Sequence, residues 1–207
     1  MEIVDITKNK IEKHIRIAKN RKETFVWLLY KPKIALCNIF FDLETNSHLN
    51  NFFLFAGSGD DAFHINMIVN HHGKHSSSRT IIRGFMYNQS TVEIVGEVNV
   101  KKRAHFSDTH LDGRALLFQE SSARIDPRLE IHTKEIQRAT HAAAVSRVNE
   151  EELFYLASRG IEPRIAEILK ARGFLLAPFF NLDPPHPFGW DEIMNPLMDK
   201  FDYVQCK

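Results

Sequence analysis

The chain has 207 residues, of which 43% are hydrophobic and 26% are charged, and its formal net charge is +1. This composition is ordinary for a folded globular protein and excludes an intrinsically disordered one, while the length allows one sizeable core or two small ones. The near-neutral charge argues against a nucleic-acid-binding protein, for which a strongly basic face is expected.

The two cysteines and the N-terminal residues bear on the cellular compartment. Cys37 and Cys206 have neither the number nor the spacing of a disulfide framework or a zinc site, which indicates a reducing environment. Basic side chains interrupt the N-terminal residues, so we expect no secretory leader, and no apolar run is long enough to span a bilayer. We therefore expect a cytoplasmic protein.

The first segment, residues 1–22, is expected to form an N-terminal amphipathic helix. Ile11, Ile15 and Ala18 recur there at helical spacing, with lysines between them. From residue 23 the pattern changes to segments rich in β-branched and aromatic residues, which are typical of strands.

Short strand-like segments then follow one another up to residue 147. They are expected at 24–30, 34–41, 52–56, 63–69, 80–86, 91–100, 104–107, 114–118, 123–131 and 135–145. Residues 57–60 supply a turn, and Asp112-Gly113 is the one good two-residue hairpin turn. The pattern alone fits an antiparallel sandwich and a parallel β-helix equally well.

The C-terminal segment, residues 148–207, is expected to be helical. Asn149 followed by Glu152, with acidic residues in the first turn, predicts an N-cap, and Gly160 supplies a stop that tolerates positive φ. The stretch between them therefore predicts a short helix with an apolar stripe.

Two further helices are expected after Gly160. The first runs from Pro163 to near Gly173, and its buried stripe consists of Ile165, Ala166, Ile168 and Leu169. Residues 178–190 are rich in proline and predict a linker or an ordered arm. Residues 191–201 predict a last short helix, interrupted at Pro196.

Several segments resemble the SufB/SufD family of iron–sulfur cluster assembly proteins. They are "PRLEI" (127–131), "HAAAV" (141–145) and "EEELFYLASRGI" (150–161), and "FYLxSRGI" is the most specific piece. Further matching positions upstream extend the resemblance over residues 65–175: His72, Ser78, Gly84, Gly96, Ala104 and "RALLF" (114–118). The pattern resembles SufD more than SufB, because Ala142 and not an acidic residue follows His141, and because Leu156 stands where SufB-like chains tend to have cysteine.

The resemblance implies a fold and a set of partners. The fold would be a right-handed parallel β-helix core, residues 23–147, with short flanking α-helices at the C-terminus. The chain would act as a non-catalytic SufD-like subunit that supports cluster building at the contact with a SufB-like chain and docks a SufC-type ATPase. Since an uncapped β-helix presents unpaired backbone groups, we also expect the chain to dimerise.

His141 is the residue that we expect to matter for the cluster. A histidine among small residues is usually structural, but Ala139 and Ala142 to Ala144 leave room for another chain or a cofactor. In the family that the chain resembles, the corresponding histidine lies near the SufB–SufD contact. The resemblance thus implies that His141 is a metal and cofactor ligand, holding no stable group but a transient iron–sulfur cluster shared with a partner chain.

The helix after Asn149 is the expected dock for the ATPase. Phe154 and Tyr155 are adjacent on a helix, so both cannot face one core stripe. The expected partner-binding residues are Glu152, Phe154, Tyr155, Arg159 and Ile161.

Catalytic motifs do not occur in the sequence. It contains no P-loop, no nucleophile elbow and no cysteine cluster, so we expect no enzyme, and any ATP dependence would come from a partner. Two alternatives stay open. One is a homodimeric structural β-helix without an assembly role, since the chain is shorter than the full-length family members that it resembles. The other, less favoured, is a histidine–metal enzyme of cupin type that uses His71, His72 and His75.

Overall fold

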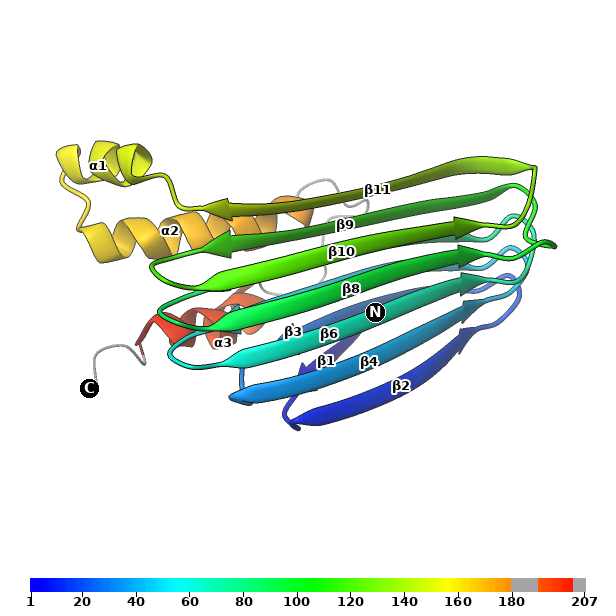
Figure 1. Cartoon of the computed structure of the whole chain (residues 1–207), viewed down its shortest axis with the longest axis horizontal. Helices are drawn as coiled ribbons and strands as arrows, with labels where there is room; N and C mark the ends of the chain where they lie inside the picture. The colour runs from blue at the N-terminus through cyan, green and yellow to red at the C-terminus, as the bar shows by residue number, and fades with distance from the viewer. Residues whose placement is uncertain (180–189, 203–207) are drawn as a thin grey trace.

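The computed structural model describes residues 1–179 and 190–202, and Figure 1 shows a flattened parallel β-helix that carries helices at one side. In the described residues every strand pairing is parallel, and the strands form two sheets. Sheet A has six strands in the order β1-β3-β5-β7-β9-β11, and sheet B has five in the order β10-β8-β6-β4-β2. Their bounds are β1 Glu2–Ile6, β2 Lys10–Ile17, β3 Lys22–Leu29, β4 Ile34–Leu43, β5 His48–Gly57, β6 Ala62–His71, β7 Ser77–Met86, β8 Thr91–Val100, β9 Ser107–Leu117, β10 Ser122–Ile131 and β11 Ile136–Arg147.

The parallel pairing confirms the predicted β-helix and excludes the antiparallel sandwich. Successive strands alternate between the sheets, so that a residue pairs with one a full turn of chain away, as Ala62 does with Thr91. The interior between the sheets is apolar. In β4, for example, Cys37, Ile39 and Phe41 alternate with more exposed residues and are fully buried. Residues on this side of either sheet are called inward below, and those on the other side outward.

Sheet A is buried on both of its faces where the C-terminal helices cover it, whereas sheet B is buried on one. The outward residues of sheet A, such as Phe52, Leu54 and Phe85, form a second core with the C-terminal helices. For this reason residues 25–29 of β3 and 52–56 of β5 are continuous apolar runs, as expected of strands covered on both sides, while β6 and β8 alternate.

A repeated corner connects sheet B to sheet A in successive turns. A non-glycine residue with positive φ occupies each of these corners: Asn46 (55°), His75 (56°) and Phe106 (58°). The next residue is a buried serine that donates a hydrogen bond of 2.7 to 2.9 Å to the carbonyl three residues earlier: Ser47, Ser76 and Ser107. These bonds satisfy backbone groups that the ladders leave unpaired. The sequence prediction did not identify this repeat.

Three α-helices are described after the strands: α1 (Glu150–Ser158), α2 (Pro163–Leu176) and α3 (Trp190–Asp202), with a short 3-10 helix at Ala177–Phe179. The predicted N-cap of α1 is confirmed, because the Asn149 side chain accepts a hydrogen bond of 2.9 Å from the Glu151 backbone. Gly160 (φ 83°) ends that helix as predicted. None of the described helices is long and apolar enough to cross a membrane.

The other C-terminal predictions need correction in part. Helix α2 continues through Gly173, and it buries Ala166 and Ala171, while the predicted stripe residues Ile165 and Leu169 are about half exposed. Helix α3 runs uninterrupted through Pro196. Pro178 belongs to the 3-10 helix, and the rest of the predicted proline-rich arm, residues 180–189, lies outside the described residues.

The predicted N-terminal amphipathic helix is wrong. Residues 1–22 contain strands β1 and β2 and the start of β3, and they belong to the same two sheets as the rest. Ile11, Ile15 and Ile17 are the inward residues of β2, but Lys13 at the remaining inward position breaks the alternation. The spacing of the isoleucines therefore resembled that of a helix, but pairing with β4 holds this segment as a strand.

The predicted hairpin turn at Asp112-Gly113 is also wrong. Both residues lie within β9, so the expected strands at 104–107 and 114–118 are a corner and the end of a single strand. Gly113 faces inward, where a Cβ atom would lie 3.0 Å from Ile125. The glycine thus allows the two sheets to pack closely at this point, and the Asp112-Gly113 pair does not form a turn.

Candidate functional site

The last strands of the two sheets, β10 and β11, form an open end of the β-helix, at the top of Figure 1. Each is paired on one edge only, β10 with β8 and β11 with β9. Within the described residues no further strand or helix covers the other edge of β11, whose residues are mostly exposed. Unpaired backbone donors and acceptors at such an edge are a template for another strand.

His141 lies at this open end on the inward side. It pairs in register with Leu111, which is a core residue, and the neighbouring inward positions are taken by Ala139, Ala143 and Val145. His141 is nonetheless exposed, because no further layer of the coil lies above it. In the described part of the chain its ring has no hydrogen-bond partner, and this differs from the usual structural histidine.

Ligands that would complete a metal site around His141 do not come from this part of the chain. The described residues contain no group of three or more metal-ligating side chains. Cys37 is fully buried inside the coil, and burial raises the pKa of its thiol to about 12, which keeps it protonated. Cys206 lies outside the described residues. The described residues therefore supply no thiolate for a cluster at His141.

The three histidines of the cupin-type alternative point in different directions. His71 faces inward, and its ring nitrogens lie 2.8 Å from the hydroxyls of Ser76 and Ser78. His72 faces outward on sheet B, where it bonds Asp42 at 2.8 Å, while His75 occupies the corner. This divergence leaves no shared metal position among them.

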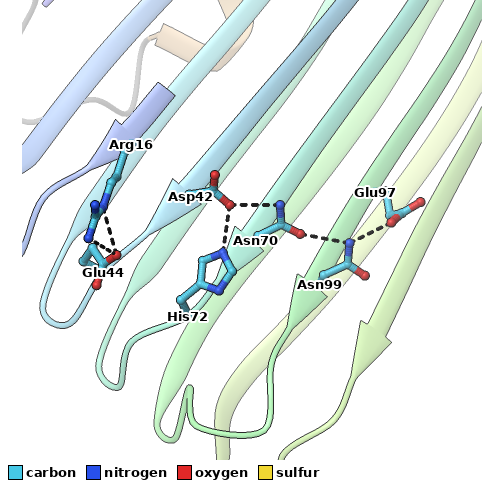
Figure 2. Close-up of polar contacts among 7 residues, drawn as sticks. All are labelled: Arg16, Asp42, Glu44, Asn70, His72, Glu97 and Asn99. Carbon is cyan, nitrogen blue, oxygen red and sulfur yellow. Dashed lines mark hydrogen bonds and ion pairs between the residues drawn. The ribbon is translucent and has the colours of Figure 1, made fainter. Parts of the chain in front are cut away.

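Figure 2 shows the surroundings of His72 on the outward side of sheet B. Asp42 also accepts from Asn70 at 3.1 Å, and Asn99 links Asn70 at 3.1 Å to Glu97 at 2.7 Å. Asp42, Asn70 and Asn99 lie in register on three adjacent strands, so the bonds between them tie one turn to the next, while the bond to Glu97 stays within β8. This arrangement accounts for His72 as a structural residue, one of the positions that carried the family resemblance.

Helix α1 projects beyond the ends of the sheets and rests on α2 (Figure 1), and none of its residues is buried. Phe154 and Tyr155 are exposed by 76% and 57%, so both are accessible to a partner. Exposed Ile165 and Leu169 of α2 add apolar surface that sequence reasoning assigned to the core. Only the packing of α2 on sheet A could have shown which side of it is free.

The predicted partner-binding residues gather on this pair of helices. Arg159 donates to the Tyr155 hydroxyl at 3.1 Å, and its guanidinium lies over the Tyr155 ring. Glu152 pairs with Lys170 of α2, and a hollow of about 340 Å³ lies beside this ion pair. Ile161 is partly buried in the connection between the helices.

Comparison with known proteins agrees with this architecture. The family model described as "SUF system FeS cluster assembly, SufBD core domain" matches residues 9–174, so the match begins well before residue 65, where the resemblance in the sequence motifs starts. An iron–sulfur cluster assembly SufBD family protein of Mycobacterium bovis is 33% identical over 142 residues, which are 58% of this chain and 36% of that protein.

Two further relatives show the same partial coverage. An iron–sulfur cluster assembly SufBD family protein of Galdieria sulphuraria is 31% identical over 135 residues, 65% of this chain and 58% of that protein. The iron–sulfur cluster assembly protein SufD of Bacillus subtilis is 31% identical over 127 residues, 61% of this chain and 29% of that protein. The chain thus spans only part of the length of these relatives. Because the family model covers most of the chain, from β2 into α2, the chain belongs to the SufBD family.

Proposed function

We propose that this chain is a non-catalytic, SufD-like subunit of an iron–sulfur cluster assembly complex. The observation that carries the proposal is the open edge of β11, which presents an exposed inward histidine, His141, among alanines. Relatives named SufD in Bacillus subtilis and Escherichia coli, 31% and 29% identical over their aligned parts, support the SufD-like assignment.

A SufB-like chain is the proposed partner at this edge. A strand of the partner would pair with β11 and continue sheet A, which would satisfy its free backbone groups. His141 would then face the junction of the two coils. Thiolates of the partner would complete the iron ligands there, and the cluster would be passed on as cargo, with none held stably by this chain.

A second copy of the chain is the alternative partner, in a structural homodimer without an assembly role. The same edge favours it, because the stretch Ala139 to Val145 is free of charge and its small side chains would not clash with their own copy. Sedimentation velocity separates the two. A SufB-like protein should convert the chain into a one-to-one complex, whereas a homodimer that is unchanged by the added protein would favour the structural alternative.

The exposed surface of α1 and α2 is the proposed dock for a SufC-type ATPase. It exposes the apolar side chains Phe154, Tyr155, Ile165 and Leu169, and exposed aromatic residues of this kind anchor partners in protein interfaces. Replacing Tyr155 and Arg159 by Ala should weaken ATPase binding about tenfold, which calorimetric titration would measure. Arg16→Ala, on the remote β2, is the control, and unchanged binding of the double variant would remove α1 from the interface.

Reconstitution tests the proposed function as a whole. The chain, a SufB-like protein and a SufC-type ATPase would be mixed under anaerobic conditions with iron, a sulfide source and ATP. The visible absorbance of the cluster should grow in the complete mixture and fail to grow when this chain is omitted. Equal growth without the chain would contradict an assembly role.

A further inference from the structure

The outward face of sheet A has an uncovered part at the end where its strands begin, on the right in Figure 1. A groove with a volume of about 370 Å³ crosses β5, β7, β9 and β11 there. This groove, here called the Arg79 groove, is lined by the outward polar residues Asn50, Ser77, Arg79, Asp108, His110 and Arg138, together with Leu49 and Ser78. All of these residues lie on the opposite side of sheet A from His141 or at its strand starts, so the groove is separate from the site described above.

Two arginines on the outward side of β7 differ in their partners. Arg83 is buried, donates to Asp112 at 2.8 Å and stacks on the ring of Phe174. Arg79 lies four residues earlier on the same side and is partly buried. In the described part of the chain Arg79 has neither an ion pair nor a hydrogen bond. Among the described residues, an anion thus faces Arg83 and none pairs with Arg79.

The neighbours of Arg79 add hydrogen-bond donors. Asn50 on β5 pairs with Arg79 in register, and its side-chain amide is also without a partner among the described residues. Ser77 lies two positions before Arg79 on the same side, and its hydroxyl lies 2.7 Å from the ring of His48. On the other side, His110 of β9 pairs with Arg79 in register, and its Nδ1 lies 2.8 Å from the Thr140 hydroxyl.

The groove carries an excess of positive charge. Arg138 binds Asp108 through two bonds of 2.9 Å, which neutralises that carboxylate and leaves Arg79 uncompensated. Burial lowers the pKa of His110, and Arg79 and Arg138 lower it further, against the opposing effects of Asp112 and Asp108. The pKa of the His110 imidazole therefore responds to the cations on both neighbouring strands, β7 and β11.

We propose that the Arg79 groove binds the phosphate group of a small phosphorylated molecule. The guanidinium of Arg79 would bind two phosphate oxygens with its planar fork, while the Asn50 amide and the Ser77 hydroxyl would donate to the others. The groove is larger than a phosphate ion, so part of it is left for the rest of the ligand. A partly buried position strengthens these bonds relative to those of a fully solvated arginine.

Inorganic phosphate is the probe for the test, with chloride at equal ionic strength as the reference. Calorimetric titration of the full chain should show saturable phosphate binding. Arg79→Gln, which keeps a polar side chain but removes the charge and the guanidinium fork, should weaken that binding by about tenfold or more. Arg16→Gln is the matched control, because Arg16 is an exposed arginine of sheet B that is paired with Glu44 (Figure 2). It should bind phosphate like the unaltered chain.

The histidine ring signals in NMR spectra give a second readout that reports the place of binding. Phosphate in the groove should raise the pKa of His110, since it offsets the nearby guanidinium groups, and it should do so in Arg16→Gln but not in Arg79→Gln. Asn50→Ala provides an independent variant if Arg79→Gln is unfolded, and it too should weaken binding. An unmoved His110 titration, or equal affinity of these groove variants and the unaltered chain, would overturn the proposal.

Discussion

Two inward-facing histidines show how the closed turns of the β-helix differ from its open end. His71, in a closed turn, is fully buried, and its ring bonds the hydroxyls of Ser76 and Ser78 at 2.8 Å. His141 takes an inward position on β11, but it is exposed and bonds to no described side chain. The same residue type therefore contributes to the core in one place and is available to a partner in the other.

The edge strands of the two sheets differ in a related way. Strand β2 carries Lys13 at an inward position, opposite the buried Ile39, and an inward charge of this kind opposes pairing with another strand. Strand β11 has no charged residue from Ala139 to Val145. The edge of β11 therefore favours pairing with a strand of another chain, and the edge of β2 opposes it.

Ala143→Lys would transfer the inward charge of β2 to β11, and we expect it to have the largest effect. Ala143 is inward and pairs with Gly113. A strand docked on β11 would bury the ammonium group without a partner, at a cost of about 4 kcal/mol, or roughly a thousandfold in the dissociation constant. Sedimentation velocity with a SufB-like protein, and with the chain alone, would measure this loss of association.

Ser146→Lys is the control for that experiment, because it puts the same charge on the outward side of the same strand. It should leave both the fold and the association unchanged. If Ala143→Lys associates as tightly as the unaltered chain, then β11 is not the contact strand, and the comparison of the two edges loses its functional meaning.

His71→Ala should give the largest loss of folding free energy among the histidine variants, about 3 kcal/mol, because it leaves a cavity and removes bonds to buried hydroxyls. Urea unfolding would measure it. His72→Ala is the adjacent control on the outward side: it removes an exposed pair with Asp42 and should cost less than about 1 kcal/mol. Similar losses in the two variants would contradict the role assigned to the buried hydroxyl contacts.

The pH dependence of stability sharpens the same contrast. Burial lowers the pKa of His71 to about 4 in the folded chain, below the value of about 6.5 in an unfolded one. Between these two values the unfolded chain binds more protons, so stability falls as the pH is lowered. Acidification from pH 7 to pH 5 should therefore cost about 2 kcal/mol through this group alone. Urea unfolding of His71→Gln should show a correspondingly smaller change, and an equal change would place the effect elsewhere.

Local sequence patterns predicted the secondary structure correctly wherever tertiary packing did not oppose them. Residues 91–100 largely alternate between apolar and polar side chains and were predicted as the strand that they form, and the chemistry around Asn149 predicted the start of α1. Two predictions were wrong because tertiary packing overruled local chemistry. In the edge strand β2, Lys13 occupies an inward position and interrupts the alternation of apolar and polar residues. In β9, Gly113 lies inward against Ile125, so the Asp112-Gly113 pair belongs to a strand and forms no turn.

The candidate site was predictable only in part. His141 was singled out by its alanine neighbours and by the family resemblance, whereas its exposure follows from the position of β11 at the open end. The Arg79 groove could not have been predicted. Asn50, Arg79 and His110 lie a full turn of chain apart, and only the register of three stacked strands brings them together.

His141→Ala should have the smallest effect on folding. The ring fills no core volume and has no hydrogen-bond partner among the described residues, so its loss should change the free energy of unfolding by less than about 0.5 kcal/mol. If it is an iron ligand at the proposed SufB-like contact, the same change should abolish cluster formation in the reconstituted complex while the partners still associate. Urea unfolding, sedimentation and cluster absorbance would be measured on one preparation. A variant that is clearly less stable yet assembles clusters at the normal rate would show that His141 is structural, and the contrast with His71 would then disappear.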